Sequence, residues 1–211
     1  MRRSAAAAPT RAAVSLFDIL SPMRIITFDI ETVGAMRGSF DPTQLELTIC
    51  CIHDSETDTY DSFLKEDLPR LWKILETADM LVGYNSDHFD IPILNKYYSG
   101  ELTNIKSLDL LKEVQNVLGR RIKLDTIAAG TLGTKKSGSG LDAITWWKEG
   151  NIKKLRDYCL KDVEITKRIF DYARDNGSIK FRELGHTQEV KLDTSAWFTP
   201  AAKPMTFSLG F

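Results

Sequence analysis

The sequence has few of the features that mark secreted, membrane or zinc-binding proteins. Its 211 residues include only three cysteines, Cys50, Cys51 and Cys159, and no two of them form a Cys-x-x-Cys pair. An odd, irregularly spaced set excludes a disulfide framework and a zinc ribbon, so the simplest setting is a reducing cytoplasm. The longest apolar runs, such as residues 49–52, are too short to cross a bilayer, and we expect no contact with membranes.

An excess of positive charge is missing as well. Lys and Arg number 28 and Asp and Glu number 29, which gives a formal net charge of −1. This balance argues against a protein that holds nucleic acid by bulk positive charge, but it allows an enzyme that grips a few nucleotides in a local groove. Hydrophobic residues make up 43% of the chain, which is enough for the core of one globular domain.

The two ends of the chain differ in composition from its middle. Residues 1–22 are rich in alanine and arginine and have no acid before Asp18. A targeting peptide can look like this, but a long apolar region is absent, and we interpret the segment as a disordered extension. We therefore expect the domain to span residues 23–180 and a partly disordered tail to span residues 181–211.

Hydrophobic periodicity predicts a mixed α/β fold. Short runs of β-branched and aromatic residues predict five strands, and apolar residues at helical spacing predict the helices that follow them. The strands are expected at 24–29, 45–53, 57–64, 79–84 and 105–110. The helices are expected at 67–77, 89–98, 123–132, 141–148 and 152–174. This order favours a five-stranded mixed sheet flanked by helices.

Two carboxylates are expected at the end of the first strand. In extended backbone the side chains of Asp29 and Glu31 point to the same face, and Ile30 points to the other. Two like charges this close are costly unless a cation lies between them, and hard oxygen ligands favour Mg²⁺ or Mn²⁺. The alternative is a solvated strand end, since acids are common in this chain.

A second candidate acid, Asp90, follows the buried run of residues 80–82. Gly83 allows a tight exit from that strand, and Asn85 can hydrogen-bond locally at the turn. Asp90 then lies near the start of a helix, close to the strand end. The alternative is an acid that is placed there only by the helix dipole.

A third segment is predicted to be helical and contains Tyr158 and Asp162. Because they are four residues apart, their side chains share one face of the helix. Leu155, Cys159 and Val163 mark the adjacent buried stripe, so this face is expected to be half-buried against the sheet. The alternative is a surface tyrosine, with Asp162 paired to a neighbouring lysine or arginine.

Together the three segments resemble the exonuclease motifs of the DEDD superfamily. The matching residues are Phe28-Asp29-Ile30-Glu31-Thr32, then Asn85 with Phe89-Asp90, then Tyr158 with Asp162. The tyrosine is typical of the DEDDy branch, which includes the proofreading domain of family B DNA polymerases. The resemblance runs from about residue 24 to residue 175, and it implies a ribonuclease-H-like fold.

The resemblance also implies a reaction and its residues. It implies 3′–5′ hydrolysis of single-stranded nucleic acid with release of nucleoside 5′-monophosphates. We expect DNA as the substrate, but RNA or short oligonucleotides are the alternative, because the metal chemistry is the same for each and the motifs do not distinguish them. Two divalent cations, Mg²⁺ or Mn²⁺, would be held by Asp29, Glu31, Asp90 and Asp162, with Asp29 between the two. Tyr158 would orient the attacking water. An acid cluster is the ligand set that such chemistry requires.

Substrate contacts and partners are open to more than one interpretation. By resemblance, Thr32, Asn85 and Phe89 would hold the terminal nucleotide. Lys135 and Lys136 lie on a glycine-rich loop that would either reach phosphates or serve as a surface connection. The competing function is a non-catalytic or partner-dependent nucleic-acid-binding subunit of a polymerase or repair complex. A protein partner would then dock on the tail from Thr194, which contains Trp197 and Phe198.

Overall fold

The fold is built on one mixed sheet. The computed structural model describes residues 23–134 and 140–199, and the sheet in it has the strand order β3-β2-β1-β4-β5. Strand β1 pairs antiparallel with β2, which pairs antiparallel with β3, whereas β4 lies parallel to β1 and β5 parallel to β4. The strands are β1 Ile25–Val33, β2 Glu46–Asp54, β3 Thr59–Leu64, β4 Met80–Gly83 and β5 Lys106–Asp109. The predicted α/β fold with a mixed five-stranded sheet is confirmed.

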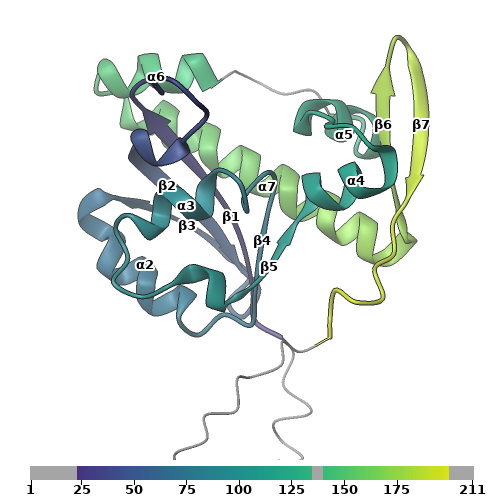
Figure 1. Ribbon diagram of the computed structural model, residues 1–211, viewed down its shortest axis with the longest axis horizontal. Helices are drawn as coiled ribbons and strands as arrows, with labels where there is room; N and C mark the ends of the chain where they lie inside the picture. The colour runs from purple at the N-terminus through teal and green to yellow at the C-terminus, as the bar shows by residue number, and fades with distance from the viewer. Residues whose placement is uncertain (1–22, 135–139, 200–211) are drawn as a thin grey trace, which may run out of the picture.

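Helices cover both faces of this sheet (Figure 1). The α-helices are α2 Leu68–Leu75, α3 Asp90–Asn95, α4 Leu110–Leu118, α5 Leu124–Thr131, α6 Gly140–Lys148 and α7 Ile152–Asn176, and three 3-10 turns are η1 Pro42–Gln44, η2 Lys65–Asp67 and η3 Leu102–Asn104. Ile26, Phe28 and Ile30 of β1 pack with α2 and α3 on one face. On the other face, α7 packs against β2 through Cys159 and Val163. Burial of both faces leaves every residue of β2 after Glu46 buried.

Strand β1 is longer than the sequence indicated. We expected it to end at Asp29, but its antiparallel ladder with β2 continues to Val33, with a bulge between Glu31 and Thr32. The parallel ladder with β4 ends earlier, at the pair Thr27–Val82. Asp29 and Glu31 are therefore inside a strand on one side, but they lie beyond the end of the neighbouring strand on the other.

The chain after α7 is also more ordered than expected. Strands β6 Ser178–Glu183 and β7 His186–Lys191 form a hairpin that packs on α5. The packing is tight, because a Cβ atom on Gly130 would lie 2.5 Å from the backbone of Phe181. Trp197, which we interpreted as a docking side chain, is 3% exposed and stacks on Phe170 with ring centroids 5.8 Å apart. That interpretation is wrong for Trp197, because its ring completes the domain's own core.

Some expectations fall on residues outside the described ranges. These are the extension at 1–22, the loop lysines Lys135 and Lys136, and the tail from residue 200. Within residues 23–134 and 140–199, no helix is both long enough and apolar enough to cross a bilayer.

Candidate active site

Three carboxylates from two elements converge on one face of the sheet. Asp29 and Glu31 project from β1 toward α7, where they meet Asp162. One carboxylate oxygen from each lies within 4.8 Å of the others, and no other group of three metal-ligating side chains is found in the described parts of the chain. Ile30, between the two strand acids, is 5% exposed and packs on the opposite face. The alternation predicted from the sequence is thus the arrangement observed, and a fully solvated strand end is wrong.

Asp90 approaches the same place from the side of β4. It is the first residue of α3, it is 4% exposed, and its Oδ1 accepts a hydrogen bond of 3.2 Å from the backbone N–H of Ile30. Since β4 has already ended, this carboxylate binds a β1 amide that lies past the last β1–β4 pair. Asp90 is therefore more than a helix-dipole acid, because it joins the start of α3 to the strand between Asp29 and Glu31.

Burial and mutual repulsion perturb these carboxylates. Burial raises the pKa of Asp29 well above its usual range, and the charges of Asp162, Asp90 and Glu31 raise it further. Burial likewise raises the pKa of Asp90 to about 7, against the opposing effect of the hydrogen bond from Ile30. A group of acids that favours protons so strongly is a group that a divalent cation would stabilise in its ionised form.

Tyr158 and Asp162 lie on the face of α7 that packs against the sheet. Tyr158 is 6% exposed and Asp162 is 5% exposed, so the surface alternative is wrong. The Tyr158 ring makes an edge contact with Trp146 of α6, with centroids 5.7 Å apart. Of the neighbouring lysines, Lys161 binds Glu164 at 2.7 Å and Lys167 binds Asp171 at 2.6 Å. Packing against Trp146 and the apolar residues of β2 holds the Tyr158 ring on the same face of α7 as Asp162.

The loop between β4 and α3 is held in a fixed shape. Gly83 is needed there because a Cβ atom would lie 2.4 Å from Cβ of the fully buried Ser86. Asn85 adopts a φ of 67°, a left-handed conformation that asparagine tolerates better than most residues. The backbone N–H of Phe89 donates to the carbonyl oxygen of Asn85 at 3.1 Å, and the Phe89 ring packs on the core beside α3. This loop sets the position of Asp90.

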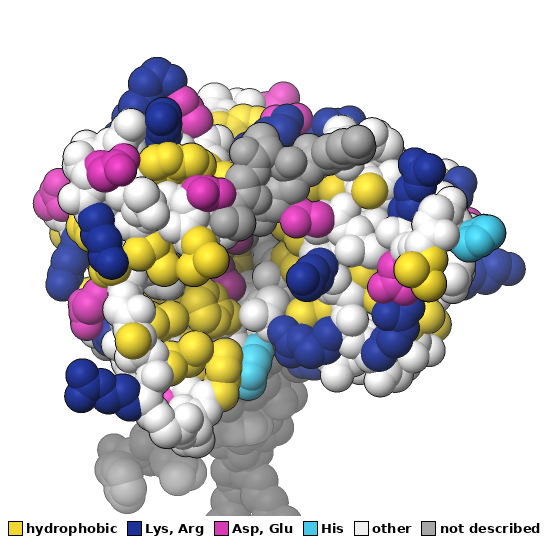
Figure 2. All heavy atoms as spheres, turned by 90° about the horizontal axis from the view of Figure 1, so that it is seen from above, with side chains coloured by type: hydrophobic (Ala, Val, Ile, Leu, Met, Phe, Trp, Pro, Cys, Tyr) yellow, Lys and Arg dark blue, Asp and Glu magenta, His cyan; other side chains and the backbone are white. Residues whose placement is uncertain are grey.

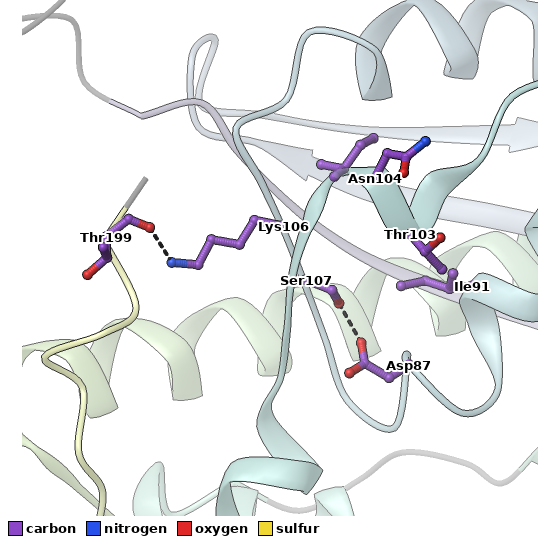
Figure 3. A pocket seen from close by; sticks show the side chains of 8 residues that line it. Asp87, Ile91, Thr103, Asn104, Lys106, Ser107 and Thr199 are labelled. Carbon is purple, nitrogen blue, oxygen red and sulfur yellow. Dashed lines mark hydrogen bonds between the residues drawn. The ribbon is translucent and has the colours of Figure 1, made fainter. Parts of the chain in front are cut away.

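Sequence reasoning did not assign a role to Asp109, the main anchor of this loop. Its carboxylate accepts from the backbone N–H groups of Asn85 at 2.7 Å and Asp87 at 3.2 Å, and it caps α4 by accepting from Leu111 at 3.0 Å. Asp87 is held further by Ser107, whose hydroxyl donates to it at 2.6 Å (Figure 3). The signal was the position of Asp109 at the end of a predicted strand, directly before a helix.

Two buried cysteines lie directly behind the acid cluster. The thiol of Cys159 contacts the carbonyl oxygen of Asp29 at 3.4 Å and its Oδ2 at 3.7 Å. Burial, together with a hydrogen bond to Cys51, raises the pKa of the Cys159 thiol well above its usual range. Cys159 is therefore a neutral packing group here, and it supports the backbone of Asp29.

Three of the five predicted substrate-binding residues, Thr32, Asn85 and Phe89, lie in the described parts of the chain. Thr32 is half-buried and follows the bulge in β1, a feature that redirects side chains at strand edges. The side chain of Asn85 is engaged by Arg121, which donates to its Oδ1 at 2.5 Å. Phe89 is half-buried and belongs to the core as much as to the surface. Lys135 and Lys136 lie outside the described residues.

The surface of the molecule is hollowed on one side. Viewed from above, a central hollow separates two lobes, with acidic side chains visible inside it, Lys and Arg side chains on one wall and a His side chain at its edge (Figure 2). A cavity of about 330 Å³ is lined by Asn85, His88, Lys112 and Arg121 among others. A larger cavity of about 620 Å³, lined by Asp87, Lys106 and Thr199, includes none of the clustered acids (Figure 3). The 330 Å³ cavity likewise includes none of Asp29, Glu31, Asp90 and Asp162 in its lining.

The donor set fits hard divalent cations. Asp29, Glu31 and Asp162 offer carboxylate oxygens alone, with no histidine or thiolate in the group, and such ligands suit Mg²⁺ or Mn²⁺. Asp90 lies close enough for its charge to act on Asp29. The arrangement is thus able to hold metal ions next to a buried tyrosine, which is a setting for hydrolysis of a phosphate ester.

Comparison with known proteins agrees with this geometry. Residues 26–177 match the family model of the RNase H superfamily. The DNA polymerase delta catalytic subunit of Candida albicans is 24% identical over an alignment of 219 residues, which covers 72% of this chain and 21% of that protein. The structure of the family B DNA polymerase from the hyperthermophilic archaeon Pyrobaculum calidifontis is similar with a TM-score of 0.57 and 20% identity, over 72% of this chain and 25% of that one. The chain thus spans a quarter or less of these relatives, and the expected ribonuclease-H-like fold is confirmed.

Proposed function

The chain belongs to the RNase H superfamily, and we propose that it is a metal-dependent 3′–5′ exonuclease that hydrolyses single-stranded nucleic acid, with DNA preferred over RNA. The observation that carries the proposal is the convergence of Asp29, Glu31 and Asp162 within 4.8 Å, with Asp90 beside them. Family membership supports nuclease chemistry. The similarity to two DNA polymerases supports a role on a DNA strand end.

The proposed site divides the work among its residues. Asp29 would contact both cations, Glu31 and Asp162 would complete the tighter site, and Asp90 would act at the second. Two divalent cations held in this way would supply an activated water and offset the negative charge that develops on the leaving 3′ oxygen. The buried Tyr158 would orient the attacking water with its hydroxyl, since its ring is fixed by the contact with Trp146.

The retained residue set favours an enzyme over a binding module. A non-catalytic descendant of the fold is expected to have lost at least one of the acids, whereas all four acids and Tyr158 are present. Asp29 and Asp90 have raised pKa values through burial and through neighbouring acids, as expected for sites tuned for function and not for stability.

The direct test is degradation of labelled oligonucleotides. Single-stranded DNA and RNA of equal sequence, labelled at the 5′ end, are incubated with Mg²⁺ or Mn²⁺, with EDTA, and with Asp29→Asn protein. The expected result is a metal-dependent ladder that shortens from the 3′ end, absent with EDTA and with the variant, and faster on DNA. Release of the 5′ label as a mononucleotide before any shortened ladder forms, or no cleavage by folded protein with either metal, would overturn the proposal.

A further inference from the structure

A buried carboxylate at the end of β5 holds the loop that leads to Asp90. Asp109 pairs in register with Gly83 of β4 and is 5% exposed. Its Oδ1 accepts a hydrogen bond of 2.7 Å from the backbone N–H of Asn85, and its Oδ2 accepts one of 3.2 Å from that of Asp87. Capping of α4 uses Oδ1, whereas Oδ2 binds the loop. The carboxylate therefore does more than cap a helix, because it directs the chain as it leaves β4.

Two backbone hydrogen bonds connect this loop to the start of α3. The N–H of Phe89 donates to the carbonyl oxygen of Asn85 at 3.1 Å, and the N–H of Ile91 donates to the carbonyl oxygen of Ser86 at 2.9 Å. Asp90 lies between the two donors, so both of its neighbours in sequence are tied to the part of the loop that β5 holds. A shift of the loop would therefore move Asp90.

The position of Asp90 in turn affects the acid cluster. Its Oδ1 accepts the N–H of Ile30, which lies between Asp29 and Glu31, at 3.2 Å. This distance is at the long end of the normal range, so a small outward shift of Asp90 would break the bond. Mg²⁺ requires nearly ideal octahedral geometry, and a displaced carboxylate is expected to bind it more weakly.

The charge of Asp109 acts on Asp90 in addition to these contacts. Both oxygens of Asp109 accept N–H groups, as an ionised carboxylate does. Burial is the main cause that raises the pKa of Asp90 to about 7, and the negative charge of Asp109 adds to the increase. A charge that favours a proton on Asp90 favours a divalent cation there more strongly, because the cation carries twice the charge.

We propose that Asp109 is a positioning residue for the cation that Asp90 would bind, and that it acts through the loop and through its charge. The inference rests on the proposed function, and it assigns control of the second cation alone to a residue that is not a ligand. Asp29, Glu31 and Asp162 project from β1 and α7, so the tighter site does not depend on this loop. Groups that orient metal ligands from behind change metal affinity or activity by about 10–100-fold when they are replaced.

The test measures Mn²⁺ binding by titration calorimetry, and cleavage as the Mn²⁺ concentration is varied, in wild-type protein, Asp109→Asn and Asp109→Ala. Asparagine keeps one acceptor oxygen but removes the charge, whereas alanine removes both. In Asp109→Ala the Kd of the weaker Mn²⁺ ion is expected to rise about tenfold or more, with a smaller rise in Asp109→Asn, while the Kd of the tighter ion stays within about twofold. Cleavage that is lost at low Mn²⁺ is expected to return at high Mn²⁺.

Asp54→Asn is the matched control for a loss of stability. Asp54 is also 5% exposed and also accepts a backbone N–H, that of Glu56 at 3.0 Å, but it lies opposite Ile26 near the start of β1. The variant is expected to melt at a lower temperature and to bind both Mn²⁺ ions like wild type. Thermal melts with EDTA give the stability of each protein. If Asp109→Ala is unfolded, the comparison of Asp109→Asn with Asp54→Asn decides.

Three results would overturn the inference. They are a weaker Kd that is the same in wild type and in Asp109→Asn, equal weakening of both Mn²⁺ ions, and binding of a single Mn²⁺ ion by wild-type protein. A weaker Kd raised as much in Asp54→Asn as in Asp109→Asn would also contradict it, because lost stability would then explain both. Two Mn²⁺ ions that respond as expected, in a protein that does not cleave, would instead overturn the proposed nuclease and leave the role of Asp109 in place.

Discussion

The ribbon formed by β1 and β2 has a buried carboxylate at one end, Asp54, and a half-buried carboxylate near its middle, Asp29, and their surroundings differ. Asp54 lies opposite the start of β1 and accepts two hydrogen bonds from Arg24, to Oδ1 at 3.2 Å and to Oδ2 at 2.5 Å. Asp29 lies three pairs further along, among Asp162, Asp90 and Glu31. Asp54 therefore faces a cation of the chain itself, whereas Asp29 faces other acids.

The pKa values record this difference. Burial alone would raise the pKa of Asp54, but the hydrogen bonds from Arg24 and from the backbone N–H of Glu56, together with the charge of Arg24, outweigh burial and lower this pKa. Burial raises the pKa of Asp29, and every neighbouring charge adds to the increase. The first arrangement stabilises the ionised acid in the folded protein, whereas the second costs stability until an external cation binds. Asp54 is thus a carboxylate that stabilises the fold, whereas Asp29 is a carboxylate suited to binding a cation.

The largest expected effect is the loss of activity on replacement of Asp29. Asp29→Asn keeps the shape of the side chain but removes the charge that the cations need, so kcat/KM is expected to fall by about 10³-fold or more. The same variant is expected to raise the melting temperature of metal-free protein at pH 8, because one of several repelling charges is gone. If Asp29→Asn lost stability as well as activity, the claim that the charge of Asp29 destabilises the metal-free protein would be contradicted.

Replacement of Tyr158 should impair the orientation of the attacking water without changing the affinity for metal ions. Tyr158→Phe keeps the ring and its contact with Trp146 but removes the hydroxyl. We expect kcat to fall by about 10²-fold, because the attacking water is no longer oriented. The Mn²⁺ affinity, measured by calorimetry, is expected to stay within about twofold of wild type. A variant that cleaves at the wild-type rate would remove Tyr158 from the mechanism.

Replacement of Asp54 at the end of the ribbon should have the opposite effects on stability and activity to Asp29→Asn. Asp54→Asn leaves Arg24 without its main partner in a partly buried place, and we expect the free energy of unfolding to fall by about 2 kcal/mol. Chemical denaturation of the two variants in the same buffer measures this. Nuclease activity per folded molecule is expected to change little. An equal stability change in both variants would show that their surroundings do not differ as described.

The pH dependence of stability should reveal the raised pKa values. Asp90 has a folded-state pKa of about 7, above the value of about 4 for an unfolded chain. Its contribution to stability is therefore fully present below pH 4 and is lost as the pH rises through 7.

Metal-free protein is thus expected to melt several degrees lower at pH 8 than at pH 5.5, since 1 kcal/mol corresponds to about 2–4 °C at this chain length. Mg²⁺ or Mn²⁺ should reverse the loss at pH 8 and have little effect at pH 5.5. Thermal melts with EDTA and with metal check this. A change in melting temperature on addition of metal that is the same at pH 5.5 and at pH 8 would contradict this expectation.

Local patterns in the sequence were enough to predict which candidate site residues share one face of a strand or a helix. Asp29 and Glu31 share a face because strand side chains alternate, and Tyr158 and Asp162 share one because a helix turn spans about four residues. The same kind of pattern placed β2, α2 and α7 within a few residues of their observed limits.

Contacts between distant segments could not be predicted in this way. The hydrogen bonds of Asp109 to the β4–α3 loop and the stacking of Phe40 on His88 depend on how the elements pack, which periodicity does not encode. The continuation of β1 to Val33 required knowledge that β2, and not β4, supports its second half. Trp197 lacked a periodic context and was therefore assigned to a tail, although it packs on Phe170 of α7.

The most direct measurement is the binding of Mn²⁺ to wild-type protein and to Asp29→Asn by titration calorimetry at pH 7, in two buffers that differ in ionisation enthalpy. The account predicts that wild-type protein binds Mn²⁺ with release of protons, because the cation displaces them from the buried acids. The variant is expected to bind much more weakly and to release fewer protons. Equal affinity and equal proton release for both proteins would contradict the claim that this cluster is a metal site.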